Sequence, residues 1–320
     1  MLVRFGVDVG GTTIKIGMFD NQCKLLTKCE INIDKTNAGA NILADICKKI
    51  NEILDEFRLS KNECMGVGIG LPGPVTASGY IQGCVNLGWG TFNVKETLSK
   101  MLEYVPVEVM NDANMAALGE QKHGSGMGSE NVVLITIGTG VGGGVISEGK
   151  IIAGTNGAAG EIGHMPVNPD ETEKCGCGKK GCLEQYASAR GIIRTARRYM
   201  EEGKESPYLS SVMNKSDSGS AAGEFTAKDV FDGAKNGDDL CALAVDSLGK
   251  YLGIALASVA AVINPDCIVI GGGVSKAGQL LLDVIDKYFK EYAFLPCRNV
   301  TFKLAELGND AGIYGGASNV

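Results

Sequence analysis

The stretch Val7-Asp8-Val9-Gly10-Gly11-Thr12 joins an apolar strand to a glycine turn, and a similar stretch returns as Ile135-Thr136-Ile137-Gly138-Thr139-Gly140. The two stretches align without a gap, and a second apolar strand follows each of them. Repetition of one strand–turn–strand unit predicts two related halves that face a common cleft. A chance similarity between two glycine hairpins is the alternative at this point.

Strand and helix patterns alternate around the two hairpins, which indicates an α/β fold. Helices are expected at residues 41–57, 93–102, 113–123, 191–202, 239–263 and 310–318, and further strands at 65–71, 107–110, 267–270 and 300–304. The Ser/Gly-rich stretch 206–223 predicts a mobile surface insertion.

The composition limits the classes of partner. A chain of 320 residues is long enough for two domains, and its net charge of −7 speaks against nucleic acid or an anionic membrane as a partner. No signal peptide is recognisable, and the most apolar stretch, 252–263, is short enough to predict a buried helix rather than a membrane span. Most of the eleven cysteines stand singly, which is typical of reduced thiols and predicts a cytoplasmic protein.

Three glycine-rich turns are candidates for binding phosphates or a nucleoside. In Asp8–Lys15 and Gly138–Gly144, main-chain N–H groups can approach an anion closely, and Asp8 stands where it can orient Mg²⁺ through water. The third turn, Gly271–Gly273, is a candidate nucleoside contact. Plain turns are the alternative for all three, and neither a P-loop nor a Rossmann motif is present.

The segment Met110-Asn111-Asp112-Ala113-Asn114 places an aspartate between a buried strand and the start of a helix. Such an aspartate is often a helix N-cap. The functional interpretation is a general base that takes a proton from a hydroxyl nucleophile. Both interpretations of Asp112 remain open from this motif alone.

A histidine and three cysteines form the most specific motif. His164 precedes Cys175, Cys177 and Cys182, and a Cys₃His set is suited to structural zinc. Glu161 and Glu184 flank the motif and can accept hydrogen bonds from sugar hydroxyls. Disulfide pairing is the alternative, although three cysteines leave one of them without a partner.

Together these motifs resemble the ROK family of repressors, open reading frames and sugar kinases. The resemblance rests on CGCGKKGCLE at Cys175–Glu184, EIGH at Glu161–His164 and LGNDAGIYGGA at Leu307–Ala317, and it runs from Phe5 to about Gly316. Within the family, the chain is most similar to bacterial glucokinases.

The resemblance implies a two-domain, actin-like (ribonuclease H-like) ATPase fold with a cleft between the domains. Residues 1–110 would form a small α/β domain that a C-terminal helix at about 305–320 completes. Residues 111–304 would form a large α/β domain that carries the zinc motif.

The resemblance also implies roles for individual residues. Asp112 would be the catalytic base, and ATP, Mg²⁺ and a structural Zn²⁺ would be bound. The implied sugar contacts are Gly73, Asn111, Asp112, Glu161, His164 and Glu184. The implied ATP contacts are Asp8, Gly10, Gly11, Thr12, Thr13, Lys15, Gly138, Thr139, Gly140, Gly142, Gly272 and Gly273. The implied metal ligands are His164, Cys175, Cys177 and Cys182.

The expected function is ATP-dependent phosphorylation of glucose at the 6-hydroxyl, in a homodimer or homotetramer. Alternatives within the class are kinases for mannose, N-acetylmannosamine, N-acetylglucosamine, fructose or allose, and polyphosphate is an alternative donor. A non-catalytic, sugar-sensing regulator is the alternative from another class. It is disfavoured because seven residues before Asp8 leave no room for a DNA-binding module.

Overall fold

The computed structural model of the chain describes residues 1–214 and 224–320. It contains two compact units. The first unit comprises Met1–Leu134, Gly143–Gly160 and Glu306–Val320, and the second comprises Ile135–Gly142 and Glu161–Ala305. The predicted domain boundary after residue 110 stays a prediction.

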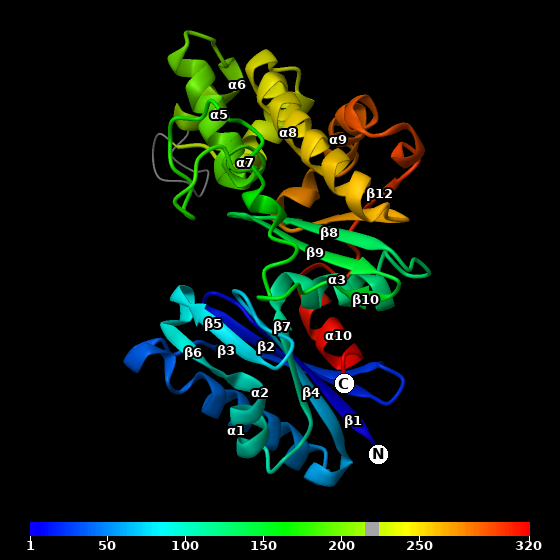
Figure 1. Ribbon diagram of the computed structural model, residues 1–320. Coiled ribbons are helices and arrows are strands. Elements are labelled where there is room, and N and C mark those ends of the chain that lie inside the picture. The colour runs from blue at the N-terminus through cyan, green and yellow to red at the C-terminus, as the bar shows by residue number, and fades with distance from the viewer. Residues whose placement is uncertain (215–223) are drawn as a thin grey trace. The chain divides into compact units, whose positions relative to one another are not determined.

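The first unit is built on a five-stranded sheet of order β3-β2-β1-β4-β7 (Figure 1). Its strands are β1 (Val3–Val9), β2 (Thr13–Asp20), β3 (Leu25–Asn32), β4 (Cys64–Leu71) and β7 (Val107–Asn111). β1 pairs antiparallel with β2, whereas β1 with β4 and β4 with β7 are parallel. The carboxyl ends of β1, β4 and β7 therefore lie at one edge of the sheet, where α/β proteins commonly place their ligands.

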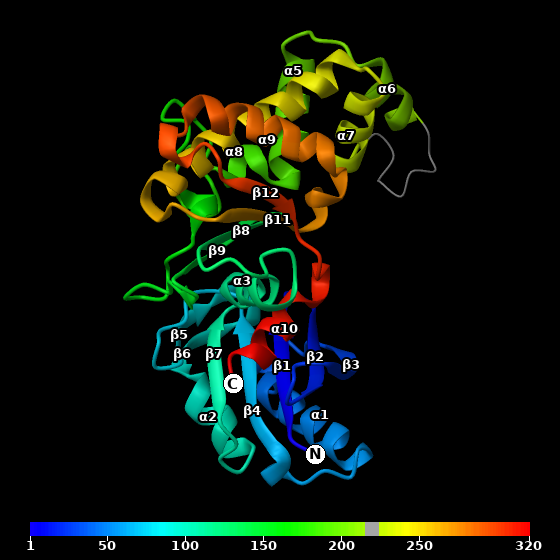
Figure 2. The same cartoon turned by 90° about the vertical axis from the view of Figure 1, so that its right-hand side faces the viewer.

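Helices cover both faces of this sheet. Apolar side chains at alternate positions of β1, such as Phe5 and Val7, join one core with α1 (Ile42–Glu56) and α2 (Val94–Met101). The opposite face lies against α10 (Ala311–Ser318), which also packs on α3 (Asp112–His123), as Figure 2 shows. A Cβ at Gly6 would stand 1.8 Å from the carbonyl oxygen of Ile313, so only glycine permits this close approach.

The second five-stranded sheet has the order β10-β9-β8-β11-β12. Its strands are β8 (Val132–Ile137), β9 (Val141–Ser147), β10 (Lys150–Ile151), β11 (Cys267–Gly271) and β12 (Thr301–Leu304). In chain order, this arrangement repeats that of the first sheet, with the glycine hairpin supplying the first two strands each time. The predicted α/β class and the repeat of the hairpin are therefore confirmed.

The helices of the second unit are α4 (Glu184–Ala187), α5 (Ala189–Glu201), α6 (Pro207–Asn214), α7 (Ala227–Lys235), α8 (Asp239–Ile263) and α9 (Gln279–Tyr292). Helices α4, α5, α7 and α9 pack against the long, buried helix α8, and α6 packs against α7. Among the described residues, α8 alone is long and apolar enough to cross a membrane, but 61% of its most apolar window is buried against neighbours that include α9 and α7. It is a core helix, as predicted. Part of the predicted insertion forms α6, and its remainder, 215–223, lies outside the described residues.

Short elements complete the chain. β5 (Tyr80–Cys84) and β6 (Trp89–Asn93) form a hairpin. The 3₁₀ helices are η1 (Thr36–Gly39), η2 (Lys61–Glu63), η3 (Val85–Leu87), η4 (Ile162–His164), η5 (Gly273–Ala277), η6 (Leu295–Cys297) and η7 (Gly308–Asp310).

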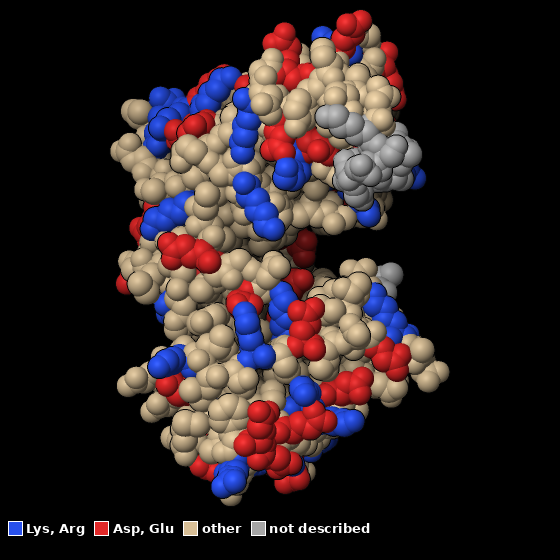
Figure 3. Space-filling model, turned by 180° about the vertical axis from the view of Figure 1, so that it is seen from behind, with Lys and Arg blue, Asp and Glu red and all other residues tan. Residues whose placement is uncertain are grey.

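Charged side chains of both signs are interspersed on the face drawn in Figure 3. Ion pairs at the protein surface include Lys61 with Glu103 at 2.6 Å and Lys95 with Glu108 at 2.7 Å. Such exposed pairs contribute little to stability, and this face presents no broad basic surface.

Candidate functional site

The junction of β7 and α3 holds Asn111 and Asp112. Asn111 is the N-cap of α3, because its side-chain oxygen accepts hydrogen bonds from the N–H groups of Ala113 at 2.9 Å and Asn114 at 3.1 Å. Asp112 is the first residue of the helix, and its Oδ1 lies 2.8 Å from the N–H of Ala113. The N-cap role therefore belongs to Asn111, which weakens the purely structural explanation of Asp112.

Asn111 also ties this junction to the loop of Gly73. Its Nδ2 donates to the carbonyl oxygen of Gly73 at 3.2 Å. Gly73 has φ of +115°, a conformation that favours glycine. The structure thus brings three predicted sugar contacts, Gly73, Asn111 and Asp112, together in the first unit. One hydrogen of the Asn111 amide is not used by these bonds.

Asp8 and Lys15 face each other across the first hairpin. They are paired in the register of β1 and β2, on the face that lies against α10. Burial raises the pKa of the Asp8 carboxyl above its usual value, and the positive charge of Lys15 opposes that rise. A Cβ at Gly312 would come within 2.7 Å of the Asp8 side chain, so Gly312 leaves the room that this carboxyl occupies.

Several glycines of the three turns have open space where a side chain would be. A Cβ at Gly11, Gly138 or Gly273 would meet no heavy atom within 4 Å, and none of the three has a positive φ. Neither packing nor backbone conformation therefore requires glycine at these positions. Space left free beside main-chain N–H groups is what an approaching phosphate needs.

The predicted metal ligands converge. One donor atom from each of His164, Cys175, Cys177 and Cys182 lies within 4.8 Å of the others. Cys177 Sγ is 3.6 Å from Cys182 Sγ, and Cys175 Sγ is 3.8 Å from His164 Nδ1. Ligand bonds of about 2.0–2.3 Å at tetrahedral angles place the donors roughly 3.5–3.8 Å apart, so these residues fit zinc.

Tight turns hold the cysteines in place. The N–H of Cys175 donates to Lys179 O at 2.7 Å, and that of Gly178 donates to Cys175 O at 2.8 Å. Gly178 and Gly181 both have positive φ, and a Cβ at Gly181 would stand 1.9 Å from Asn168 O. These turns help to direct the cysteine side chains toward one another.

Glu184 links the cysteine motif to the second glycine hairpin. Its Oε2 accepts a hydrogen bond from the N–H of Val141 at 3.0 Å, and its Oε1 lies 3.8 Å from Cys175 Sγ. A Cβ at Gly140 would meet Glu184 Oε2 at 2.2 Å. Glu184, predicted as a sugar contact, thus also supports the hairpin. The other predicted sugar contact nearby, Glu161, is exposed and accepts the N–H of His164 through its carbonyl oxygen at 3.0 Å.

A buried carboxylate anchors the cysteine motif to α5. Glu171 is paired with Arg194 at 2.9 Å and Arg198 at 3.0 Å, and Tyr186 donates its hydroxyl to the same group. Burial acts to raise the pKa of Glu171, but the hydrogen bonds from Arg198 and Tyr186 outweigh it and hold the pKa well below its usual value. Sequence reasoning missed Glu171, because nothing in its local sequence distinguishes it from a surface glutamate.

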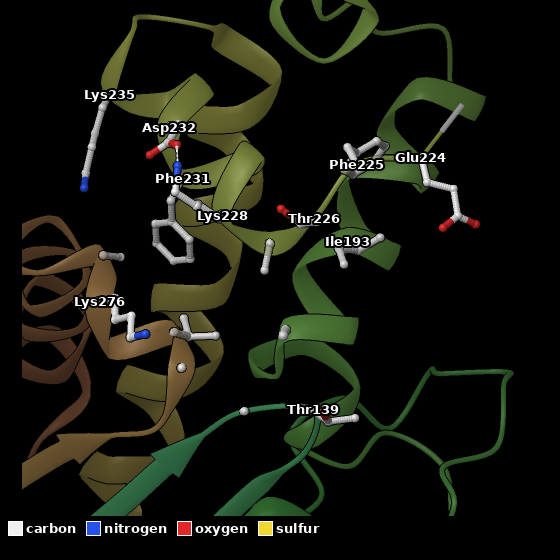
Figure 4. Close-up of a pocket in the computed structure, with 16 residues that line it drawn as sticks. Thr139, Ile193, Glu224, Phe225, Thr226, Lys228, Phe231, Asp232, Lys235 and Lys276 are labelled. Atoms are coloured by element: carbon white, nitrogen blue, oxygen red, sulfur yellow. Dashed lines mark hydrogen bonds and ion pairs between the residues drawn. The ribbon is translucent and has the colours of Figure 1, made fainter. Parts of the chain in front are cut away.

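A pocket of about 840 Å³ opens beside the second glycine hairpin, wholly within the second unit (Figure 4). Of the predicted ATP contacts, Gly138, Thr139 and Gly273 line it. Ile193, Phe225 and Phe231 give it an apolar wall, and Lys276 extends into it from η5, as Figure 4 shows. The volume suits a nucleotide-sized ligand.

Phe225, Phe231 and Lys276 were not predicted. The aromatic residues resemble ordinary core positions, and α7 begins at a capping box formed by Thr226 and Asp229. No sequence spacing connects α7 with the glycine turns, so this wall could be found only by folding the chain.

The sequence profile of the ROK family matches residues 4–320. The chain is 46% identical over 314 residues to a glucokinase of Halalkalibacterium halodurans, covering 97% of this chain and 92% of that protein. The structure of a ROK family glucokinase from Streptomyces griseus, in complex with glucose and AMPPNP, is 33% identical, with a TM-score of 0.78 over 99% of both chains.

The comparisons also include a regulator. A ROK family transcriptional regulator, a homologue of the E. coli MLC protein, has a TM-score of 0.82 at 26% identity. The match covers 99% of this chain and 77% of the regulator. Likeness of fold alone therefore does not separate kinases from regulators.

Proposed function

This chain belongs to the ROK family, and from that premise we propose that it is an ATP-dependent kinase that phosphorylates glucose at the 6-hydroxyl. The observation that carries the proposal is the junction at Asp112. The neighbouring Asn111 caps α3, so the N-cap role does not account for the aspartate at position 112. The identity of 46% to a glucokinase over nearly the full chain supports glucose as the acceptor.

In the proposed reaction, Asp112 accepts the proton of the sugar 6-hydroxyl as the oxygen attacks the γ-phosphorus of ATP in line. The transfer breaks the bond between the γ-phosphorus and the β,γ-bridging oxygen and leaves ADP. Catalysis of this kind comes mostly from positioning and neutralisation of charge. Asn111 is held by its cap and by Gly73 O, so its remaining amide hydrogen is presented in a fixed direction.

Main-chain N–H groups of the two hairpins would receive the phosphates, next to the open positions at Gly11 and Gly138. The apolar wall of the 840 Å³ pocket would receive the nucleoside, and Lys276 provides a positive charge there. Mg²⁺, which neutralises phosphate charge in such reactions, would be oriented by Asp8. Gly10, Thr12, Thr13, Lys15, Thr139, Gly140, Gly142 and Gly272 stay predicted ATP contacts.

The Cys₃His cluster would hold one structural zinc ion. All four tetrahedral positions would be filled by protein, so the ion would fix the loop and take no part in phosphoryl transfer. With Nδ1 of His164 facing Cys175, Nε2 of the same ring is the nitrogen that remains for a sugar hydroxyl. Glu161, His164 and Glu184 stay predicted sugar contacts, and a cytoplasmic homodimer or homotetramer stays the predicted state.

The test is ADP release by the purified protein with Mg·ATP and a panel of glucose, mannose, N-acetylmannosamine, N-acetylglucosamine, fructose and allose. We expect kcat/KM to be highest for glucose, by at least about tenfold, because a missing or altered hydroxyl leaves buried polar groups unpaired. A higher kcat/KM for another sugar would make that sugar, rather than glucose, the preferred substrate. Sugar binding without turnover would favour a sensing role. Replacing ATP with tripolyphosphate and measuring the phosphorylated sugar tests whether polyphosphate can be the phosphoryl donor.

A further inference from the structure

Helix α5 carries four arginines beside a second pocket of the second unit. Arg190, Arg194, Arg197 and Arg198 all line this pocket of about 450 Å³. The spacing of Arg190, Arg194 and Arg197 places their side chains on one face of the helix. Three further lining residues, Ile193, Glu224 and Phe225, also line the 840 Å³ pocket, so the two pockets share a wall.

The arginines are not equally neutralised. Glu171 and Glu173 pair with Arg194 and Arg198 at 2.9–3.0 Å. Within residues 1–214 and 224–320, Arg190 has no carboxylate partner, and Arg197 comes only within 3.9 Å of Glu224.

One arginine of this cluster also has an unsatisfied donor. Arg194 Nε is buried and has no hydrogen-bond partner among the described residues. A buried, unpaired donor is costly, so Glu171 and Glu173 satisfy the Arg194 guanidinium incompletely.

We propose that this pocket, outside the nucleotide and sugar sites, binds the phosphate group of a small phosphorylated ligand. Guanidinium groups present planar, paired N–H donors that match phosphate oxygens, and Arg190 and Arg197 have such donors available. A volume of about 450 Å³ suits a small molecule rather than a peptide. Glu201 and Glu224, which also line the pocket, would repel a broad polyanionic surface such as nucleic acid.

The site is connected to the glycine hairpin through one rigid element. α5 begins at Ala189, whose N–H donates to Gly138 O at 2.8 Å, and the same helix carries Ile193 and the four arginines. The phosphate ligand would therefore bind to the helix that also forms part of the nucleoside pocket. This site does not depend on the identity of the sugar that the protein phosphorylates.

The test is isothermal titration of the full-length protein, kept saturated with glucose and AMPPNP, with inorganic phosphate, glucose 6-phosphate and tripolyphosphate. We expect saturable binding of at least one probe. Tightest binding of glucose 6-phosphate identifies a phosphorylated sugar, and tightest binding of tripolyphosphate identifies an extended phosphate chain. Equal binding of all three shows that the phosphate group alone is recognised.

Variants assign the binding to this pocket. Arg190→Gln combined with Arg197→Gln should raise the Kd at least about tenfold, whereas Arg58→Gln, an exposed arginine of the first unit, should leave it unchanged. Arg190→Lys combined with Arg197→Lys keeps the positive charges, so the Kd of this variant should lie between those of the Gln double variant and the Arg58→Gln control. Absence of saturable binding with every probe, or equal Kd values in the Gln variant and the Arg58→Gln control, would overturn the proposal.

Discussion

The two glycine hairpins share a loop length, and they differ in the hydrogen bond that closes the turn and in the groups that surround it. Three residues separate the strands in each, Gly10–Thr12 between β1 and β2, and Gly138–Gly140 between β8 and β9. In the first, the N–H of Gly10 donates to Thr13 O at 2.9 Å, and in the second, the N–H of Gly138 donates to Gly140 O at 2.9 Å.

The first hairpin carries its own charges, and the second does not. Asp8 and Lys15 of the first correspond to Thr136 and Gly143 of the second. The second instead receives a carboxylate from outside, because Glu184 accepts the N–H of Val141. One backbone device thus serves two purposes. The first half supplies ionisable groups, and the second supplies main-chain donors held by the loop of the cysteine motif.

The largest effect on activity is expected from removing the negative charge of Asp112. Asp112→Asn should lower kcat by about 10²–10⁴-fold, because general-base catalysis contributes that much. Asp55→Asn, on the exposed side of α1, is the matched control and should keep kcat within about twofold. Steady-state ADP release measures both. Full activity of the Asp112→Asn variant would show that Asp112 is not the catalytic base.

In the second half, Cys177→Ser should affect the metal and the sugar. Wild-type protein should carry about one zinc per chain, and the variant should lose most of it and raise KM for glucose about 10–100-fold. Metal analysis by mass spectrometry and the ADP assay measure these effects. Cys47→Ser, whose thiol lies on α1, is the control. Active wild-type protein without zinc would contradict the structural-zinc proposal.

The contribution of Glu171, which anchors the cysteine motif to α5, should be measurable in the free energy of unfolding. Glu171→Gln should lower the free energy of unfolding by about 2 kcal/mol at pH 7, because its charged hydrogen bonds are buried. Glu173→Gln removes a carboxylate that pairs with the same arginines but is 57% exposed, and should cost under about 1 kcal/mol. Urea unfolding measures both.

The effect of Glu171 should depend on pH. Its pKa is held below the ordinary value of 4.5, so its stabilisation is fully present above that pH and is lost as the pH falls toward the lower folded-state pKa. The difference between wild type and Glu171→Gln should therefore shrink below about pH 4.5. A constant difference down to pH 3 would show that the carboxylate charge is not what stabilises the motif.

Two glycines of the second hairpin should separate packing from binding. Gly140→Ala forces its methyl group onto Glu184, and should lower the free energy of unfolding by about 1–2 kcal/mol. Gly138→Ala points into open space and should leave stability unchanged within about 0.5 kcal/mol, yet weaken ATP binding. Urea unfolding and titration with AMPPNP measure the two. Equal behaviour of the two variants would show that Gly138 and Gly140 do not have separate roles in binding and packing.

Much of the fold could be predicted because the local patterns are strong. Helix α8 has the predicted bounds, because its apolar run ends before Pro265. The strand Leu25–Asn32 was missed, because it is an edge strand in which Lys28 and Glu30 interrupt the apolar pattern.

The sequence motifs of the site could be predicted, but the contacts between residues far apart in the chain could not. Glu184 reaches Val141 across 43 residues, and Phe225 and Phe231 reach the glycine turns from another element, so no spacing in the sequence reveals them. The N-cap is a further example. Sequence reasoning considered Asp112 for it, whereas Asn111 has the extended backbone and the side-chain oxygen that capping requires.

The most direct test of the central claim compares glucose with 6-deoxyglucose in the ADP-release assay. We predict turnover with glucose, none with 6-deoxyglucose, and competitive inhibition of the glucose reaction by 6-deoxyglucose, because that sugar lacks the hydroxyl that Asp112 is proposed to deprotonate. Equal ADP release with both sugars would contradict phosphorylation at the 6-hydroxyl.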